Sequence, residues 1–425
     1  MNVRTIKVGL DYGTSASKIV FWDEMSPGKP KSYIIQKGKS ARISSSIALT
    51  GDTLNFGLGP DDAQLGPTDQ WYESVKMRLA AEASQKYSAF CYGGTPSPPQ
   101  GFTFQELAIL TLWFLRTEAE RVIAAKLKLR STEFRLSVIV GIPRCFYENE
   151  TTRNVFLDIA VKAHALQRMQ SFPGMSLSTS QAKEAIRSVA AAAAMQQDYR
   201  DWLRSESEAA MYWPVRSPEI PGGSYAEIDI GAGTTNASIV GIWSVYAGKR
   251  WLKQNLGFHG AFSRPVGTDA IDAAIAAAKG LSKPECLRLR GQERELLQAI
   301  SARHMQPVYD DIYEAYQLAS RRAAGRLTSA EQITFPKHEI FFTGGGSLIP
   351  GLQHALSRGR RVRNLEPPSD LYYLDETPVR KNDLVFLSVA YGLSFGKDEV
   401  PAEYTCEEES RPMPKVKGMS VIYEK

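Results

Sequence analysis

The sequence predicts an α/β protein built from two related halves. A strand, a turn of glycine and hydroxyl residues and a second strand occupy residues 8–20, and the same phrase returns at residues 226–240 with one extra turn residue. Along the chain, apolar runs typical of strands alternate with segments of helical periodicity. A stretch rich in proline and glycine, residues 214–223, separates the halves. These observations predict two lobes of mixed sheets with helices around a cleft.

The first half is expected to open with strands and to continue with helices. Strands are predicted at residues 6–10, 18–22, 31–36 and 43–50. A short helix is predicted over residues 70–83, followed by a loop at 84–101. A long helix then starts at Thr103, because Thr103 and Glu106 have the spacing of a capping box. The half ends with a strand over 136–142, closed by Pro143, and helices over 154–166 and 181–197.

The second half repeats the order of strand, hairpin and helices. After the second hairpin the sequence predicts helices at residues 270–278 and 294–324. A strand over 339–343 leads into three consecutive glycines, residues 344–346, and helices follow at 350–357 and 383–395. From Lys397 the chain becomes charged and contains proline, which indicates a tail.

Composition excludes several classes of function. The chain has 425 residues, of which 51 are basic and 46 acidic. The charged residues are spread along the chain, so the charge distribution predicts neither a nucleic acid nor a membrane partner. Four scattered cysteines without a CxxC pair and five scattered histidines argue against a zinc site or a disulfide framework and fit a reducing compartment. No apolar run approaches about 20 residues, and no leader is apparent, so the expected location is cytoplasmic.

The chemistry-bearing residues of both hairpins follow one scheme: an aspartate ends the first strand, and glycines and hydroxyl residues form the turn. Glycine lets backbone N–H groups approach phosphate oxygens, and hydroxyls add donors. An aspartate before the turn can hold Mg²⁺ through its water ligands. The residues in question are Asp11, Gly13, Thr14 and Ser15 in the first hairpin and Asp229, Gly231, Gly233, Thr234 and Thr235 in the second. Facing each other across a cleft, the two hairpins would hold ATP and Mg²⁺, with Asp11 and Asp229 as the water-mediated metal ligands.

Six segments in order resemble the actin/Hsp70/sugar-kinase superfamily, and specifically its Hsp70 branch. The two hairpins resemble the phosphate-1 and phosphate-2 motifs. The other four are residues 71–79, 140–143, 205–210 and 342–350, which resemble the catalytic-lysine helix, the strand with the interlobe proline, the connecting motif and the adenosine motif. The chain has no GxxxxGK[ST] phrase, so a P-loop enzyme is not predicted.

The resemblance implies an actin-like ATPase fold and a set of roles. Lys76, Glu206, Asp229 and Thr234 would be catalytic, and Gly344, Gly345, Gly346 and Ser347 would contact the adenosine. It also implies lobe I over residues 1–214, lobe II over 222–377, a final helix over 378–396 that returns to lobe I, and a tail over 397–425. Two structural alternatives stay open: Lys76 could be a surface residue of an amphipathic helix, and Glu208 is a rival to Glu206.

The chain also departs from the Hsp70 pattern. Asn236 stands where these proteins usually have an aspartate, which favours a slow ATPase, and Leu348 stands where an arginine often stacks on adenine. The residues after Gly396 are too few for a peptide-binding domain. We therefore expect a stand-alone ATPase whose conformational change is read by a separate protein partner. A nucleotide-sensing scaffold without appreciable turnover, a self-assembling actin-like filament protein and a small-molecule kinase are the alternatives.

Overall fold

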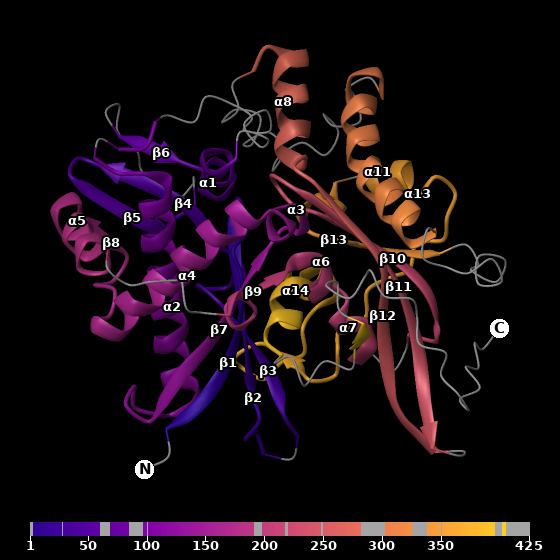
Figure 1. Cartoon of the computed structure of the whole chain (residues 1–425), viewed down its shortest axis with the longest axis horizontal. Coiled ribbons are helices and arrows are strands. Elements are labelled where there is room, and N and C mark those ends of the chain that lie inside the picture. Colours follow the sequence, from indigo (N-terminus) through magenta and orange to yellow (C-terminus); the bar gives the residue numbers. More distant parts are fainter. Residues whose placement is uncertain are drawn as a thin grey trace. The chain divides into compact units, whose positions relative to one another are not determined.

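The computed structural model describes residues 3–27, 29–59, 69–84, 97–99, 101–190, 198–216, 220–247, 250–281, 302–324, 338–349, 351–395 and 402–404 (Figure 1). Its contacts divide the chain into two compact units. The first contains Met1–Ile142, Phe146–Arg204 and Asp370–Thr377, and the second contains Pro143–Cys145, Ser205–Ser369 and Pro378–Lys425. The mixture of sheets and helices confirms the predicted α/β class.

The first unit is built on a mixed sheet with the strand order β8-β5-β4-β2-β1-β7-β9. Three further strands join it: β3 pairs with β2, β14 pairs with β3, and β6 pairs with β4. The strands are β1 (Arg4–Asp11), β2 (Ala16–Asp23), β3 (Lys31–Ile35), β4 (Ile43–Thr50), β5 (Thr53–Gly57), β6 (Gln70–Tyr72), β7 (Phe134–Ile142), β8 (Ser176–Ser178), β9 (Leu203–Ser205) and β14 (Leu371–Tyr372). The buried ends of β1 and β7 lie next to each other in parallel, which sets Asp11 opposite Gly141.

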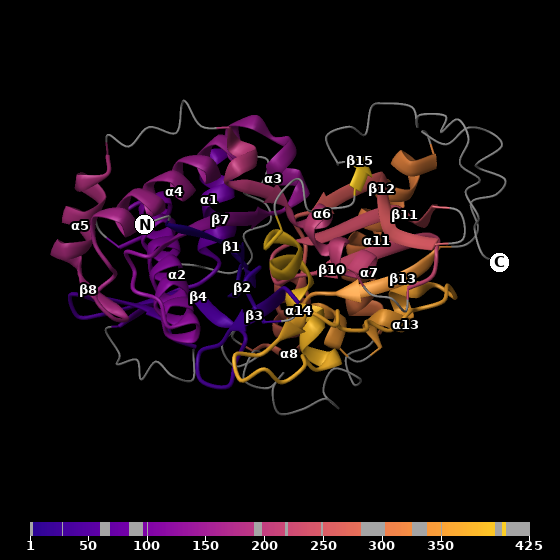
Figure 2. The same ribbon diagram turned by 90° about the horizontal axis from the view of Figure 1, so that it is seen from below.

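Helices cover this sheet, and α2 and α4 lie against each other in both views (Figures 1 and 2). The helices are α1 (Val75–Ala83), α2 (Phe104–Leu127), α3 (Arg144–Glu148), α4 (Glu150–Met169) and α5 (Thr179–Ser188), with a 3₁₀ turn at Tyr199–Asp201. The capping box predicted for α2 is confirmed: the Thr103 side chain accepts from the Glu106 backbone, and the Glu106 side chain accepts from the Thr103 backbone.

A partly buried polar network joins α2 and α4. The Arg116 guanidinium donates to Gln167 at 2.8 Å and to Nδ1 of His164 at 2.8 Å. Burial lowers the pKa of Arg116 to about 9. Burial, with the Arg116 charge as the next cause, lowers the pKa of His164 to about 4. Because arginine only donates, His164 accepts with Nδ1 and stays neutral at physiological pH.

The second unit is built on a sheet with the order β13-β10-β11-β12-β15. Its strands are β10 (Gly223–Ile230), β11 (Thr235–Ala247), β12 (Arg250–Arg264), β13 (Glu339–Thr343) and β15 (Ala402–Tyr404). Its helices are α6 (Glu206–Ala210), α7 (Tyr212–Arg216), α8 (Thr268–Lys279), α11 (Ala302–Ala324), α13 (Leu352–Ser357) and α14 (Lys381–Leu393), with a 3₁₀ turn at Gly345–Leu348. Figure 1 shows β11 and β12 as a long twisted hairpin with α11 alongside, and α11 packs on β12.

The two sheets repeat one local topology. In the first unit β1 pairs antiparallel with β2 and parallel with β7, and β2 pairs antiparallel with β3. In the second unit β10 pairs antiparallel with β11 and parallel with β13, and β11 pairs antiparallel with β12. The two related halves predicted from the repeated hairpin thus share the arrangement of four strands.

The hairpins also agree in register, which corrects the expectation of an extra turn residue in the second copy. Asp11 pairs with Lys18, and Asp229 pairs with Asn236. Each aspartate therefore faces the residue seven positions later. An alignment on the glycines and hydroxyl residues makes the second turn look longer, whereas the backbone pairing aligns Asp11 with Asp229. Lys18 and Asn236 consequently occupy equivalent positions.

Other predicted elements need correction or extension. The helix predicted over 70–83 is a strand at Gln70–Tyr72 followed by a helix from Val75, because Ser74 adopts a left-handed backbone with φ 56° that separates the two. The short strands β5 and β9 and the long strand β12 were not predicted. Residues 378–395, expected to return to the first lobe, belong to the second unit, and Asp370–Thr377 is the segment that joins the first. Most of the loop at 84–101, part of the helix at 181–197 and the tail, apart from 402–404, lie outside the described residues.

Candidate functional site

The first hairpin holds its aspartate in an ion pair. Asp11 ends β1 and is buried, and its carboxylate lies 2.8 Å from Nζ of Lys18 on β2. Gly13 forms the turn, where an added Cβ would collide with the carbonyl oxygen of Ala16. This close approach requires glycine. Lys18 was not predicted from the sequence, although its place seven residues after Asp11 is a usable signal once the strands are known to pair.

The rest of the first turn is fixed by strand β4. The Ser15 carbonyl accepts from the Ser45 backbone N–H at 3.1 Å, and the Ser17 and Ser45 hydroxyls lie 2.8 Å apart in a buried contact. Thr14 is buried and Ser15 is exposed at the turn. The hairpin therefore presents Ser15 to solvent on a backbone that β4 holds in place.

Lys76 lies in the first turn of α1 and is only 2 % exposed. The helix packs on α2 and α4, and its buried positions include both neighbours of Lys76 in sequence, Val75 and Met77. The alternative of a solvated surface lysine is thereby excluded. A buried ammonium carries a desolvation cost of several kcal/mol, so a lysine is seldom retained in such a place without a charged or polar counterpart.

The second hairpin is tied to the start of α8. The carbonyl groups of Gly231 and Ala232 accept from the backbone N–H groups of Thr268 and Asp269 at 2.9 and 2.8 Å. Gly267, just before α8, allows this contact, because a Cβ there would come within 2.5 Å of both carbonyl oxygens. These bonds fix the turn that contains the predicted Gly231 and Gly233.

The predicted threonines of this hairpin differ in their surroundings. Thr234 is buried, and its carbonyl accepts from the Gly231 backbone N–H at 2.9 Å, which closes the turn. The Thr235 hydroxyl donates to the Val266 carbonyl at 2.7 Å. The Thr235 hydroxyl proton is thus used in a hydrogen bond within the protein. The assignment of Thr235 to nucleotide binding stays a prediction.

Asp229, at the end of β10, is brought together with Glu206 by an amide. Nδ2 of Asn236 lies 3.0 Å from Oε2 of Glu206 and 3.3 Å from Oδ2 of Asp229, within donating distance of both carboxylates. Oδ1 of Asn236 accepts from the Ser263 hydroxyl at 2.5 Å. All of these side chains are buried. Two residues predicted from distant motifs therefore share one hydrogen-bond network, and the sequence analysis missed Ser263.

The structure also distinguishes Glu206 from its rival Glu208. Glu206 is the first residue of α6 and faces Asn236, whereas Glu208 accepts a hydrogen bond from the Tyr212 hydroxyl. The carboxylate that joins Asp229 is therefore that of Glu206. The short helix α6 is held against α14, where a Cβ on Gly392 would collide with the carbonyl of Ala209.

A further carboxyl group, Glu227, lies on the same face of β10 as Asp229, two residues earlier. It is fully buried, and the Thr343 hydroxyl on β13 donates to it. Burial raises the pKa of Glu227 well above its ordinary value of 4.5, the Asp229 charge raises it further, and the Thr343 hydrogen bond acts in the opposite sense. Burial therefore favours the protonated, uncharged form of the Glu227 carboxyl group. It was not a candidate from sequence, because alternation in a strand usually marks such a position as apolar.

The glycine run after β13 approaches this network. Gly344 has φ 76°, in the left-handed region that favours glycine, and its missing Cβ would come within 2.5 Å of Oδ1 of Asp229. Gly346 is buried against Ile230, and the Ser347 hydroxyl donates to the Gly344 carbonyl at 2.7 Å. Gly344 thus lies beside Asp229, while Gly345 is exposed at the beginning of the 3₁₀ turn.

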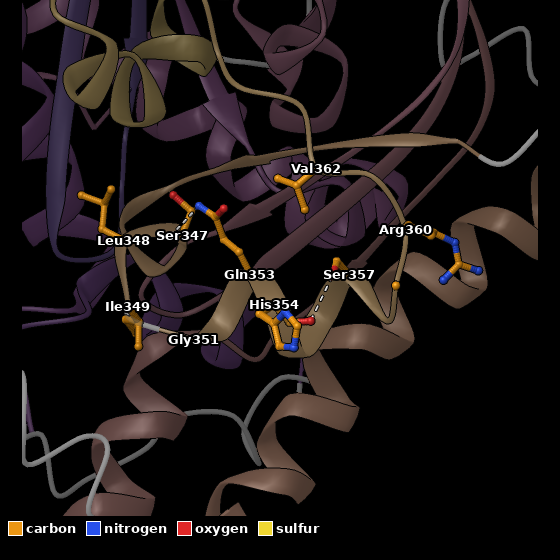
Figure 3. Close-up of a pocket in the computed structure, with 10 residues that line it drawn as sticks. Ser347, Leu348, Ile349, Gly351, Gln353, His354, Ser357, Arg360 and Val362 are labelled. Atoms are coloured by element: carbon orange, nitrogen blue, oxygen red, sulfur yellow. Dashed lines mark hydrogen bonds between the residues drawn. The ribbon is translucent and has the colours of Figure 1, made fainter.

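An open depression of about 650 Å³ borders this segment (Figure 3). Ser347 is the one member of the predicted adenosine group that lines it, and the exposed Leu348 lies beside Ser347 at its edge. Gln353 donates to the Ser347 carbonyl at 2.9 Å, and Figure 3 shows its side chain directed toward Ser347. The polar side chains that line the depression are those of Ser347, Gln353, His354, Ser357 and Arg360.

Within the described residues, no three or more histidine, cysteine, aspartate and glutamate side chains are grouped so as to bind a metal ion directly. The acidic and amide groups at Asp229 suit a cation that keeps its water ligands. None of the helices in the described ranges is both long and apolar enough to cross a membrane.

Comparison with known proteins adds no family to this geometry. No protein-family model matches the chain, and none of the curated proteins matches it. The candidate site therefore rests on its own residues: an ion-paired aspartate in the first hairpin, and in the second an aspartate that an amide joins to Glu206 of α6.

Proposed function

We propose that this chain is an ATPase that binds ATP–Mg²⁺ with one phosphate hairpin from each unit and hydrolyses it slowly. The observation that carries the proposal is the repeated four-strand topology with a buried aspartate at the same register position of each hairpin. A tight glycine turn directly after such an aspartate suits a phosphate chain. The joining of Glu206 to Asp229 adds a second carboxylate where a hydrated cation would be held.

The residues would act by positioning and by charge. Phosphoryl transfer to water spreads negative charge over the γ-phosphate oxygens, so cations and fixed donors do most of the work. Mg²⁺, when bound with the nucleotide, would neutralise phosphate charge. Lys76 would supply a further positive charge, Asp229 and Glu206 would hold water molecules of the metal, and the Thr234 hydroxyl would donate to phosphate or orient the attacking water.

Hydrolysis would change the conformation of the chain, and a separate protein partner would read that change. The neutral Asn236 beside Asp229 supports slow turnover, because an amide cannot accept a proton from water. A nucleotide-sensing scaffold with negligible turnover is the second candidate, and the same observation favours it.

The test is ATP hydrolysis by the purified chain, with light scattering recorded in the same sample. We expect turnover that Lys76→Ala abolishes and that Arg78→Ala, a matched change of a basic residue on the same helix, leaves intact. ATP at 100 times its Kd should raise the free energy of unfolding by about 2.7 kcal/mol. Absence of that stabilisation with ATP–Mg²⁺ would sink the proposal. Binding without turnover would select the scaffold, and scattering that grows with ATP would select a self-assembling filament.

A further inference from the structure

The segment that follows α13 carries four arginines within residues 358–363. Two of them stack on aromatic rings of α11. Cζ of Arg358 lies 4.0 Å from the ring centre of Tyr313, and Cζ of Arg360 lies 5.0 Å from the ring centre of Tyr316. Nη1 of Arg360 also donates to the Tyr313 hydroxyl at 2.9 Å. Both tyrosines are buried, so these stacking contacts hold the two arginine side chains in defined positions.

Carboxylates bind three of these arginines within the described part of the chain. Arg358 pairs with Asp310 at 2.6 Å. Glu339 pairs with Arg361 at 2.9 Å and with Arg363 at 2.7 Å. In these contacts two carboxylates serve three arginines. The planar guanidinium group matches the geometry of a carboxylate, and this segment already presents its guanidinium groups to acidic side chains.

The fourth arginine, Arg360, also lines the open depression of about 650 Å³ described above. Figure 3 shows Arg360 and Leu348 on opposite sides of it. Leu348 is 47 % exposed, and Ile349 and Val362 add apolar surface to the lining. The described contacts of Arg360 are with tyrosines, so no carboxylate among the described residues balances its charge there. The depression therefore combines an exposed apolar side with a positioned cation.

We propose that this depression and its arginines form a docking surface for an acidic segment of a protein partner, which places an apolar side chain against Leu348 and a carboxylate on Arg360. Charge complementarity favours this occupant, because the neighbouring arginines already bind carboxylates. Arginine side chains held in place are also common at the centres of protein interfaces. The inference deepens the proposed function, since it gives the chemistry of the partner that would read the conformational change. Among the residues that line the depression, none comes from either hairpin.

The experiment is fluorescence anisotropy with the full chain, without nucleotide, and a labelled peptide of glutamates around a central leucine as the probe. The wild type should bind this peptide, and added NaCl should weaken the binding. A peptide with serine in place of leucine should bind less tightly. Leu348→Asp and Arg360→Glu should each raise the Kd about ten-fold. Arg121→Glu is the matched control, because it reverses an exposed, ion-paired arginine of α2 and should leave the Kd unchanged.

Absence of peptide binding would overturn the inference, as would equal Kd values for the wild type, Leu348→Asp and Arg360→Glu. A labelled oligothymidylate that binds more tightly than the peptide, and loses affinity in Arg360→Glu, would assign the surface to nucleic acid and refute the protein partner. If Arg360→Glu does not fold, Leu348→Asp decides, because Leu348 is exposed and its replacement leaves the stacked arginines in place. ATP is absent throughout, so a failure of peptide binding leaves the proposed ATPase untouched, and a failure to bind ATP leaves this result unchanged.

Discussion

Asp11 and Lys18 are cross-strand partners whose charged groups meet 2.8 Å apart at the base of the first hairpin. Their side chains are 8 % and 16 % exposed, so the pair is largely removed from water. The partner in the second hairpin is an amide, and this one difference makes the two repeated hairpins chemically unequal.

The first prediction concerns that pair. Lys18→Met keeps most of the apolar part of the side chain and leaves the Asp11 carboxylate buried without this cation, which should lower the free energy of unfolding by about 3 kcal/mol. Chemical denaturation measures the loss. In an Asp11→Asn background the same change should cost much less. Equal costs in the two backgrounds would show that the pair is not what stabilises the hairpin.

The second prediction concerns the buried carboxyl group of Glu227. Its pKa is raised in the folded state, so above pH 4.5 the unfolded chain releases a proton that the folded chain keeps, and stability falls as pH rises. Glu227→Gln has no proton to lose. Its stability relative to the wild type should therefore grow by up to about 1.4 kcal/mol for each pH unit above 4.5, until the folded pKa is reached. Denaturation at pH 4, 6 and 8 measures this, and parallel pH profiles would contradict it.

The third prediction concerns acid stability and His164. Its pKa is about 4 in the folded state against an ordinary 6.5, so between these values the unfolded chain binds a proton that the folded chain does not. Stability should fall as pH drops from 6.5 to 4, by about 1–2 kcal/mol after allowance for the partial exposure of the ring. His164→Gln, which can still accept from Arg116, should flatten this part of the profile. Burial also lowers the pKa of His338 to about 4. The loss of stability over the same pH range that remains in His164→Gln should therefore come in part from His338.

The fourth prediction concerns Gly392 on α14. In an exposed helix, Gly→Ala usually stabilises by up to about 1 kcal/mol. Here the added methyl group would collide with the Ala209 carbonyl of α6, so Gly392→Ala should destabilise instead. A rise in Tm would mean that α6 moves aside at little cost.

Sequence patterns predicted the strands and helices whose signals are local. The strand predictions at 43–50 and 339–343 match the observed limits, and the predicted capping box at Thr103 is present. These features depend on residues that are close together in the sequence, so a local pattern can predict them. Strand β12 was missed, since its partner β11 and not its own composition decides its conformation. Ser74 was missed as a helix start because a left-handed serine has no sequence signal.

The candidate site was predictable only in part for the same reason. Motif order selected Glu206 and Asp229 as candidates, and the structure brings the two side chains together through Asn236. The roles of Lys18, Ser263 and Glu227 depend on which strands pair and in which register. The contacts of Ser263 with Asn236 and of Glu227 with Thr343 link residues distant in the chain, and no local sequence pattern encodes them.

The attachment of the second hairpin to α8 fixes the polarity of its turn. In a trans peptide the carbonyl and the following N–H point in opposite directions. The carbonyls of Gly231 and Ala232 are directed at α8, so the N–H groups of Ala232 and Gly233 are directed away from it. On one side of the turn, the carbonyl groups of Gly231 and Ala232 are used in hydrogen bonds to α8. On the other side, the N–H groups of Ala232 and Gly233 carry a partial positive charge. An anion that approaches from that side would find these donors already aligned, because folding has already ordered the turn. Binding would then carry little additional cost in conformational entropy.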